Sequence, residues 1–157
     1  MPLKILAFSA ICDRVGLVFL VGGKLKDWRT SRKAARSSVE AAGYAQQMLN
    51  FYQPNAVVVE KITVCRKGEA TCKLIQAMAM VAEQNYVLDV SVERDHPYQS
   101  KYEEAQALVK AYPLFAPLLP KKRQIFDSEP RAMVLFEALA LGNAIAHGGA
   151  EPLAAAM

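Results

Sequence analysis

The chain has 157 residues, a formal net charge of +4 and 53% hydrophobic residues. This length suits a single domain, and the apolar content is enough for a buried core. No run of eighteen apolar residues occurs, so a transmembrane helix is excluded, and the start lacks the longer apolar segment of a secretory signal. The three cysteines include no C-x-x-C pair, which argues against a disulfide scaffold or zinc ribbon and favours a cytoplasmic location.

The first half of the chain predicts a strand meander followed by a helix. Strands are expected over 3–9, 15–21 and 24–29, with a tight turn at Gly22-Gly23 between the last two. Helical spacing of apolar residues predicts a helix over 31–52. Its inward-facing candidates are Val39, Tyr44, Met48, Leu49 and Tyr52.

The second half alternates helices and strands. The predicted elements are a strand over 56–62, a helix over 69–84, a strand over 86–92 and a helix over 100–112. A loop or short turns are expected over 113–127, then a last helix over 129–147 with Ser128 as N-cap and Pro130 in its first turn. Residues 1–147 are thus expected to form one α/β domain, and residues 148–157 a flexible tail. Its mixed sheet would combine a three-strand antiparallel meander with two parallel strands, flanked by helices.

Basic residues gather in three clusters, which suits a polyanionic partner such as nucleic acid. A solvated surface is the alternative for each cluster taken alone. The predicted nucleic-acid-binding residues are Arg29, Arg32, Lys61, Arg66, Lys67, Lys73, Lys121, Lys122 and Arg123.

Three segments resemble the RuvC resolvase family, whose fold is RNase H-like. The start, ILAFSAICDRVGLVFL, resembles the family's I-D-P-G opening, and the last helix, VLFEALALGNAIAH, resembles its acidic D-A-L-A-I-A helix. Between them, VVVEKITVCRKGEATCKLIQAMAM resembles a strand that ends in a catalytic Glu, then a basic loop and a helix. The resemblance implies an endonuclease that cuts branched or structured DNA with Mg²⁺ or Mn²⁺. It also implies a homodimer formed through the helix over 69–84.

The carboxylate set of that family is incomplete in this chain. By the resemblance, Glu60 and Glu137 take catalytic and metal-binding positions, whereas the first-strand Asp falls on Ser9 and one helix Asp falls on Val134. Serine is uncharged and a poor ligand for Mg²⁺, which prefers carboxylate oxygens. Replacement ligands are available in Asp13, Asp127 and Glu129, although a turn residue or a helix N-terminal charge is the alternative for each.

Two functions therefore stay open. The chain is either a divergent metal-dependent endonuclease with a rebuilt site, or an inactive RuvC-like dimer that binds DNA or a protein partner. A structural ion pair is the alternative interpretation of both Glu60 and Glu137. A sugar-kinase-like use of ATP is disfavoured, because no glycine-rich phosphate loop follows a strand.

Overall fold

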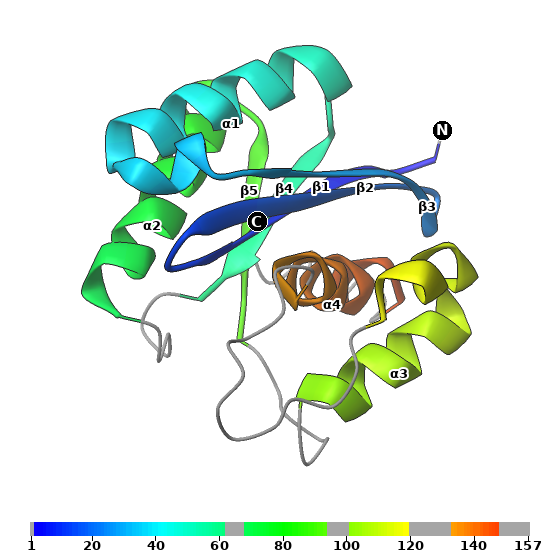
Figure 1. The fold of residues 1–157 in the computed structure, drawn as a ribbon. Coiled ribbons are helices and arrows are strands. Elements are labelled where there is room, and N and C mark those ends of the chain that lie inside the picture. The colour runs from blue at the N-terminus through cyan, green and yellow to red at the C-terminus, as the bar shows by residue number, and fades with distance from the viewer. Residues whose placement is uncertain (1, 62–67, 94–100, 120–132, 148–157) are drawn as a thin grey trace, which may run out of the picture.

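The computed structural model describes residues 2–61, 68–93, 101–119 and 133–147. Five strands form one sheet in the order β3-β2-β1-β4-β5 (Figure 1). The strands are β1 (Lys4–Ile11), β2 (Arg14–Val21), β3 (Lys24–Ser31), β4 (Ala56–Glu60) and β5 (Leu88–Val92). The helices are α1 (Ser38–Tyr52), α2 (Glu69–Gln84), α3 (Lys101–Ala111) and α4 (Met133–His147), with short 3₁₀ helices η1 (Lys33–Arg36) and η3 (Pro113–Leu118). None of the described helices is long and apolar enough to cross a membrane.

The sheet is mixed, as the sequence predicts. β1, β2 and β3 form an antiparallel meander, and β4 pairs in parallel with both β1 and β5. The turn between β2 and β3 uses Gly22 and Gly23 at φ 59° and 80°, a left-handed conformation that glycine adopts without steric cost. The predicted RNase H-like α/β architecture is therefore confirmed for the described residues.

Helices cover both faces of the sheet (Figure 1). α1 and α2 pack on one face, where the core includes Leu6, Phe8 and Leu17. α4, with α3 beyond it, covers the other face, where the core includes Ile5 and Val18. Because both faces are covered, every residue of β1 from Ile5 to Ala10 is buried, which accounts for its nearly continuous apolar sequence.

α4 lies unusually close to the strands at two glycines. A Cβ atom on Gly142 would lie 2.8 Å from Leu20 Cδ1, and one on Gly16 would lie 2.9 Å from Val134 Cγ1. Glycine at these two positions lets the helix approach the sheet more closely than any other residue would. This approach fixes the position of the acidic side chain that α4 carries.

The prediction of one helix over 31–52 is wrong at its start. β3 continues to Ser31, whose Oγ accepts a hydrogen bond from the Ala34 N–H at 3.1 Å as the chain turns into η1. Ser37 then adopts an extended conformation and its hydroxyl accepts from the Glu40 N–H, so that α1 begins only at Ser38. Val39, predicted to face inward, is 82% exposed, because it lies on the side of α1 opposite the buried stripe of Ala41, Ala45, Met48 and Leu49.

The fifth strand is also shorter than predicted. Tyr86, expected within it, is 99% exposed and has φ 59°, a conformation that no strand residue adopts, and β5 begins at Leu88. The other described strands and helices match their predicted positions to within about two residues, apart from the last helix, whose predicted start at residue 129 lies outside the described residues. The predicted N-cap Ser128, Pro130 and the tail over 148–157 lie outside the described residues.

Candidate functional site

Ser9 and Glu60 lie side by side near the carboxyl ends of two neighbouring parallel strands. Ala7 of β1 pairs with Val58 of β4, so the residues two positions further on, Ser9 and Glu60, share one level and one face of the sheet. That face is the one that α4 covers, since Ala7 and Val58 belong to the core beneath α4. Side chains at the carboxyl ends of parallel strands are well placed to form a site in an open α/β sheet.

α4 brings Glu137 to the same place. The Ser9 hydroxyl donates a hydrogen bond of 3.0 Å to Glu137 Oε2, and the two residues are 2% and 3% exposed. Glu137 lies in an otherwise apolar helix, where the burial of a carboxylate without hydrogen bonds lowers stability by about 3 kcal/mol. The sequence required a partner for Glu137, and the structure identifies the Ser9 hydroxyl as one.

Glu60 is also largely buried, at 7% exposure. No hydrogen bond or ion pair to its carboxylate is formed by the residues that the structure describes, and in particular not by the neighbouring Lys61, which is exposed. The main chain at this point stays in the sheet, because the Lys61 N–H donates to the Val92 carbonyl at 2.8 Å. A carboxylate in this position can bind a cation or accept a hydrogen bond from a donor.

The position of Val134 excludes an acidic side chain without rearrangement. Val134 is fully buried and its methyl groups lie against Gly16 of β2. Since Gly16 pairs with Ser9 across β1 and β2, Val134 packs directly beside the Ser9–Glu137 pair. One turn of α4 thus contributes an apolar contact where the resemblance would place a second carboxylate.

Arg14 is a residue that the sequence did not single out. It pairs with Ile11 at the start of β2 and shares a face with Gly16, two residues on, so it lies on the same side of the sheet as Ser9. Its Nε is buried and forms no hydrogen bond to any described residue. The alternation of side chains along β2, combined with the position of Ser9, is the sequence pattern that would have placed Arg14 on this face of the sheet.

The described residues do not supply a two-metal site. They contain no group of three or more His, Cys, Asp or Glu side chains close enough to hold a metal ion. A two-ion site needs several carboxylates shared between the ions, and here Ser9 contributes a hydroxyl that is donated to Glu137. Asp13 is exposed in the β1–β2 turn. Asp127 and Glu129 lie outside the described residues.

The predicted nucleic-acid-binding residues are spread over several elements. Arg29 of β3 is engaged at the C-terminal end of α1, where its Nε donates to Tyr52 Oη at 3.0 Å and its guanidinium lies 4.7 Å from the Phe51 ring centroid. This engagement raises the pKa of Arg29, chiefly through its hydrogen bond to Tyr52. Lys73 pairs with Glu69 on α2 at 3.5 Å, and Arg32 and Lys61 are exposed. The others, Arg66, Lys67, Lys121, Lys122 and Arg123, lie outside the described residues.

Tyr52 links this cluster to the meander. Its hydroxyl donates to Asp27 Oδ2 at 2.6 Å while it accepts from Arg29, and burial together with Asp27 raises the pKa of Tyr52 to about 12. The cluster ties α1 to β3 through neutral and charged hydrogen bonds. Arg29 therefore has a structural role in addition to its predicted one.

Comparison with known proteins gives a likeness of fold. No family model matches the chain, and no curated protein matches it. Among solved structures, the chain is similar to RuvC of Thermus thermophilus, with a TM-score of 0.63, 15% identity and 97% of each chain covered. It is also similar to T. thermophilus RuvC in complex with a Holliday junction substrate, with a TM-score of 0.57, 16% identity, and 93% of this chain and 92% of the other covered.

The likeness extends over nearly the whole chain and includes the part of the sheet that carries Ser9 and Glu60. At these identities it bears on the fold alone. The family resemblance seen in the three sequence segments is thereby matched by the arrangement of the backbone. This chain has the RuvC-like form of the RNase H-like fold.

Proposed function

We propose that this protein binds branched DNA, such as a four-way junction, without cutting it. The proposal is supported by the RuvC-like fold, since one of the similar structures holds a Holliday junction. The exposed basic residues Arg32, Lys61 and Lys73 supply cations for phosphate contacts. Arg66, Lys67 and the run Lys121, Lys122 and Arg123 are expected to add to them. We propose that the protein binds this DNA in the cytoplasm.

The Ser9–Glu137 hydrogen bond is the observation that most supports binding without cleavage. Where the family resemblance implies a carboxylate able to hold a cation, this chain places a hydroxyl that donates to the neighbouring Glu137. The pair is buried and closely packed by Val134 and Gly16. Such an arrangement stabilises the packing of α4 on the sheet without requiring a metal ion.

Cleavage is the second candidate, and Glu60 favours it. Glu60 as a whole residue is 7% exposed and its carboxylate forms no ion pair with the described residues, so a cation would offset the cost of burying this residue. A divergent endonuclease using Mg²⁺ or Mn²⁺ would need a further ligand, for which Asp127, Glu129 and Asp13 are the predicted sources. Glu60 and Glu137 would then be the catalytic carboxylates.

Both candidates are tested with the full chain and labelled four-way, flap and linear DNA. Binding is measured by fluorescence anisotropy at several salt concentrations, and cleavage is measured with Mg²⁺ or Mn²⁺. We expect tighter binding to the four-way junction than to linear DNA, an affinity that falls with salt, and no cleavage. Absence of binding to all three substrates at low salt would overturn the proposed function.

Glu60→Gln decides between the two candidates, with Glu83→Gln on the exposed part of α2 as the matched control. For a binding protein, neither variant cleaves and both bind as the parent does. Cleavage by the parent that is lost in Glu60→Gln but kept in Glu83→Gln would establish the endonuclease and reject the proposal of binding alone.

A further inference from the structure

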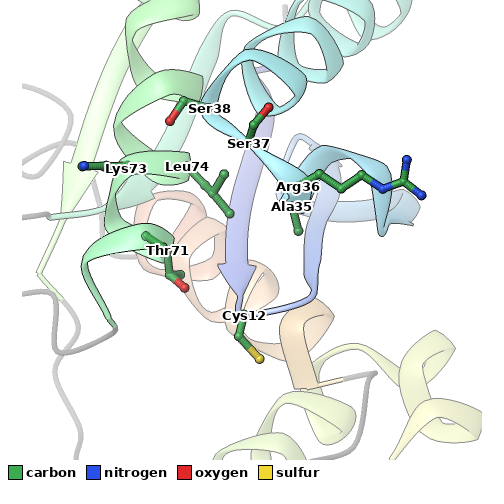
Figure 2. A pocket seen from close by; sticks show the side chains of 9 residues that line it. Cys12, Ala35, Arg36, Ser37, Ser38, Thr71, Lys73 and Leu74 are labelled. Atoms are coloured by element: carbon green, nitrogen blue, oxygen red, sulfur yellow. The ribbon is translucent and has the colours of Figure 1, made fainter.

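A cavity of about 200 Å³ opens on the α1 and α2 face of the sheet, beside the β1–β2 turn (Figure 2). It lies between the N-terminal ends of two long helices, α1 and α2, and Cys12 lines it from the turn. Its volume is several times the ~30 Å³ that one water molecule occupies in the liquid. The cavity is therefore large enough for a small ligand.

The α2 end of this cavity presents backbone donors. Gly68 is the N-cap of α2 and has no side chain to accept from the first-turn N–H groups. Ala70 and Thr71, which line the cavity, are in that first turn, and their N–H groups donate to no acceptor among the described residues. Ser38, the first residue of α1, lines the opposite side, so the positive ends of two helix dipoles meet here.

Thr71 gives an independent indication of a ligand. It is only 6% exposed, and its hydroxyl forms no hydrogen bond with any part of the chain that the structure describes. Figure 2 shows this hydroxyl on the side of α2 that faces Cys12, within the cavity lining. The hydroxyl lines the open cavity, where a ligand with acceptor oxygens would accept a hydrogen bond from it.

The charges at the cavity favour an anion. No acidic side chain is among its lining residues, whereas Arg36 and Lys73 are. In Figure 2 these two side chains extend outward on opposite sides, so neither is a direct ligand in this conformation, and the charge of Lys73 is offset by its pairing with Glu69. Arg36 is then the main source of positive charge at the rim. Hydroxyl and N–H donors inside a positive rim match a tetrahedral oxyanion.

We propose that this cavity binds a phosphoryl group, through the Thr71 hydroxyl and the N–H groups of Ala70 and Thr71. The group is either a phosphodiester of the DNA backbone or free inorganic phosphate, and the DNA source rests on the proposed function. Cys12 follows β1 directly and Ser9 lies near its end, so the cavity and the Glu60 region lie at the same end of the sheet, on opposite faces. A backbone phosphate bound in the cavity would fix the position of DNA across this end of the sheet.

Cys12 provides a direct reporter of occupancy, because its thiol is free, exposed and part of the cavity lining. Its alkylation by iodoacetamide is followed by peptide mass spectrometry in the folded full chain. We expect sodium phosphate to slow the reaction relative to sodium chloride at the same pH and ionic strength. A four-way junction is tested in parallel as the second source of the group.

Thr71→Val removes the hydroxyl and keeps the shape of the side chain. We expect it to weaken the protection of Cys12 by phosphate about tenfold, as loss of one hydrogen bond to a charged group implies. Thr30→Val, at an exposed position on β3 outside the cavity, should leave protection unchanged. Arg36→Gln, compared with Lys26→Gln on β3, tests the positive rim if the Thr71 variant does not fold.

The outcomes separate this proposal from the proposed function. Protection by both phosphate and junction supports a backbone phosphodiester, and protection by phosphate alone supports free phosphate. If phosphate protects Cys12 but the protein binds no DNA, the cavity proposal stands and the proposed function fails. If neither probe slows alkylation while the junction is bound normally, the cavity proposal is overturned and the proposed function stands.

Discussion

The hydroxyl of Ser9 donates to Glu137, a residue that is only 3% exposed, so its removal would take one hydrogen bond from Glu137 Oε2. We predict that Ser9→Ala lowers the free energy of unfolding by about 1–3 kcal/mol, the usual range for the loss of a buried hydrogen bond to a carboxyl group. Urea denaturation followed by circular dichroism measures the change. Ser91→Ala is the matched control, since Ser91 is exposed on β5 and should change stability little. Equal stability of the two variants would show that the Ser9 hydroxyl contributes nothing.

Asp89 makes a second prediction at this scale, through pH. Its Oδ1 is buried without a partner among the described residues, and burial, with a smaller effect of Glu83, raises the pKa of Asp89. The folded state therefore binds this proton more tightly than the unfolded chain does. Protonation of Asp89 adds its full contribution to the free energy of unfolding below the unfolded pKa of about 3.9, and this contribution is lost as the pH rises through the folded pKa. Charged Asp89 is therefore unfavourable at neutral pH.

We expect Asp89→Asn to raise the free energy of unfolding at pH 7, and the difference from the parent to shrink at about pH 3, where Asp89 is largely protonated in both states. Urea denaturation at the two pH values tests this. The exposed Glu93→Gln at the end of β5 should show no such dependence. A difference of the same size at both pH values would contradict the argument.

Which residues the sequence could identify depended on local pattern. Glu60 and Glu137 were found because a carboxylate at the end of an apolar strand, or within an apolar helix, stands out along the chain. The bond from Ser9 to Glu137 spans 128 positions and depends on how closely α4 approaches β1, which no local pattern records. The alternation along β2 placed Arg14 on the same face as Ser9, but only the packed structure shows that its Nε is buried without a partner among the described residues. The place of Thr71 in the cavity lining is likewise seen only in the packed structure.

At the scale of elements, the sequence predicted the strands and helices well but not where α1 begins. The spacing of Met48, Leu49 and Tyr52 predicts the inner face of α1 correctly, and all three are buried. The run from Ser31 to Ser37 contains no apolar pattern that separates a strand end, a 3₁₀ turn and a helix cap. Those boundaries were set by hydrogen bonds of Ser31 and Ser37, which compete with a continuous helix.

The contact of α4 with the sheet is the element-scale feature most open to test. Gly142→Ala and Gly43→Ala both replace a helical glycine, so both gain about 0.5–1 kcal/mol from backbone propensity. At Gly43 a new Cβ meets nothing within 4 Å, whereas at Gly142 it would lie 2.8 Å from Leu20 Cδ1 and 3.4 Å from Ala7 Cβ. We expect Gly43→Ala to stabilise the protein and Gly142→Ala to be about 1–3 kcal/mol less stable than that control. Thermal and urea denaturation of both variants measure this difference, and equal gains would mean that α4 is not closely packed.

At the scale of the whole molecule, the predicted homodimer through residues 69–84 has a defined surface. The inner face of α2 buries Leu74, Ile75 and Met78 against α1 and the sheet. On its outer side Met80 is 49% exposed, and Tyr86, just beyond the helix, is 99% exposed. Exposed large apolar side chains favour contact with a second copy, and a two-fold dimer would repeat each DNA-contacting surface twice.

We therefore predict a dimer in sedimentation experiments at micromolar concentration, and a shift toward monomer in Met80→Glu, because a carboxylate in an apolar interface would be desolvated. Val39→Glu is the matched control, since Val39 is an apolar residue that is 82% exposed on a different helix, α1. If dimerisation creates the junction-binding form, Met80→Glu should weaken junction binding more than binding to linear DNA, whereas Val39→Glu should change neither. If the Met80→Glu protein remains dimeric, the interface does not involve this part of α2. If the parent is monomeric and still prefers the junction, one subunit recognises the branch by itself.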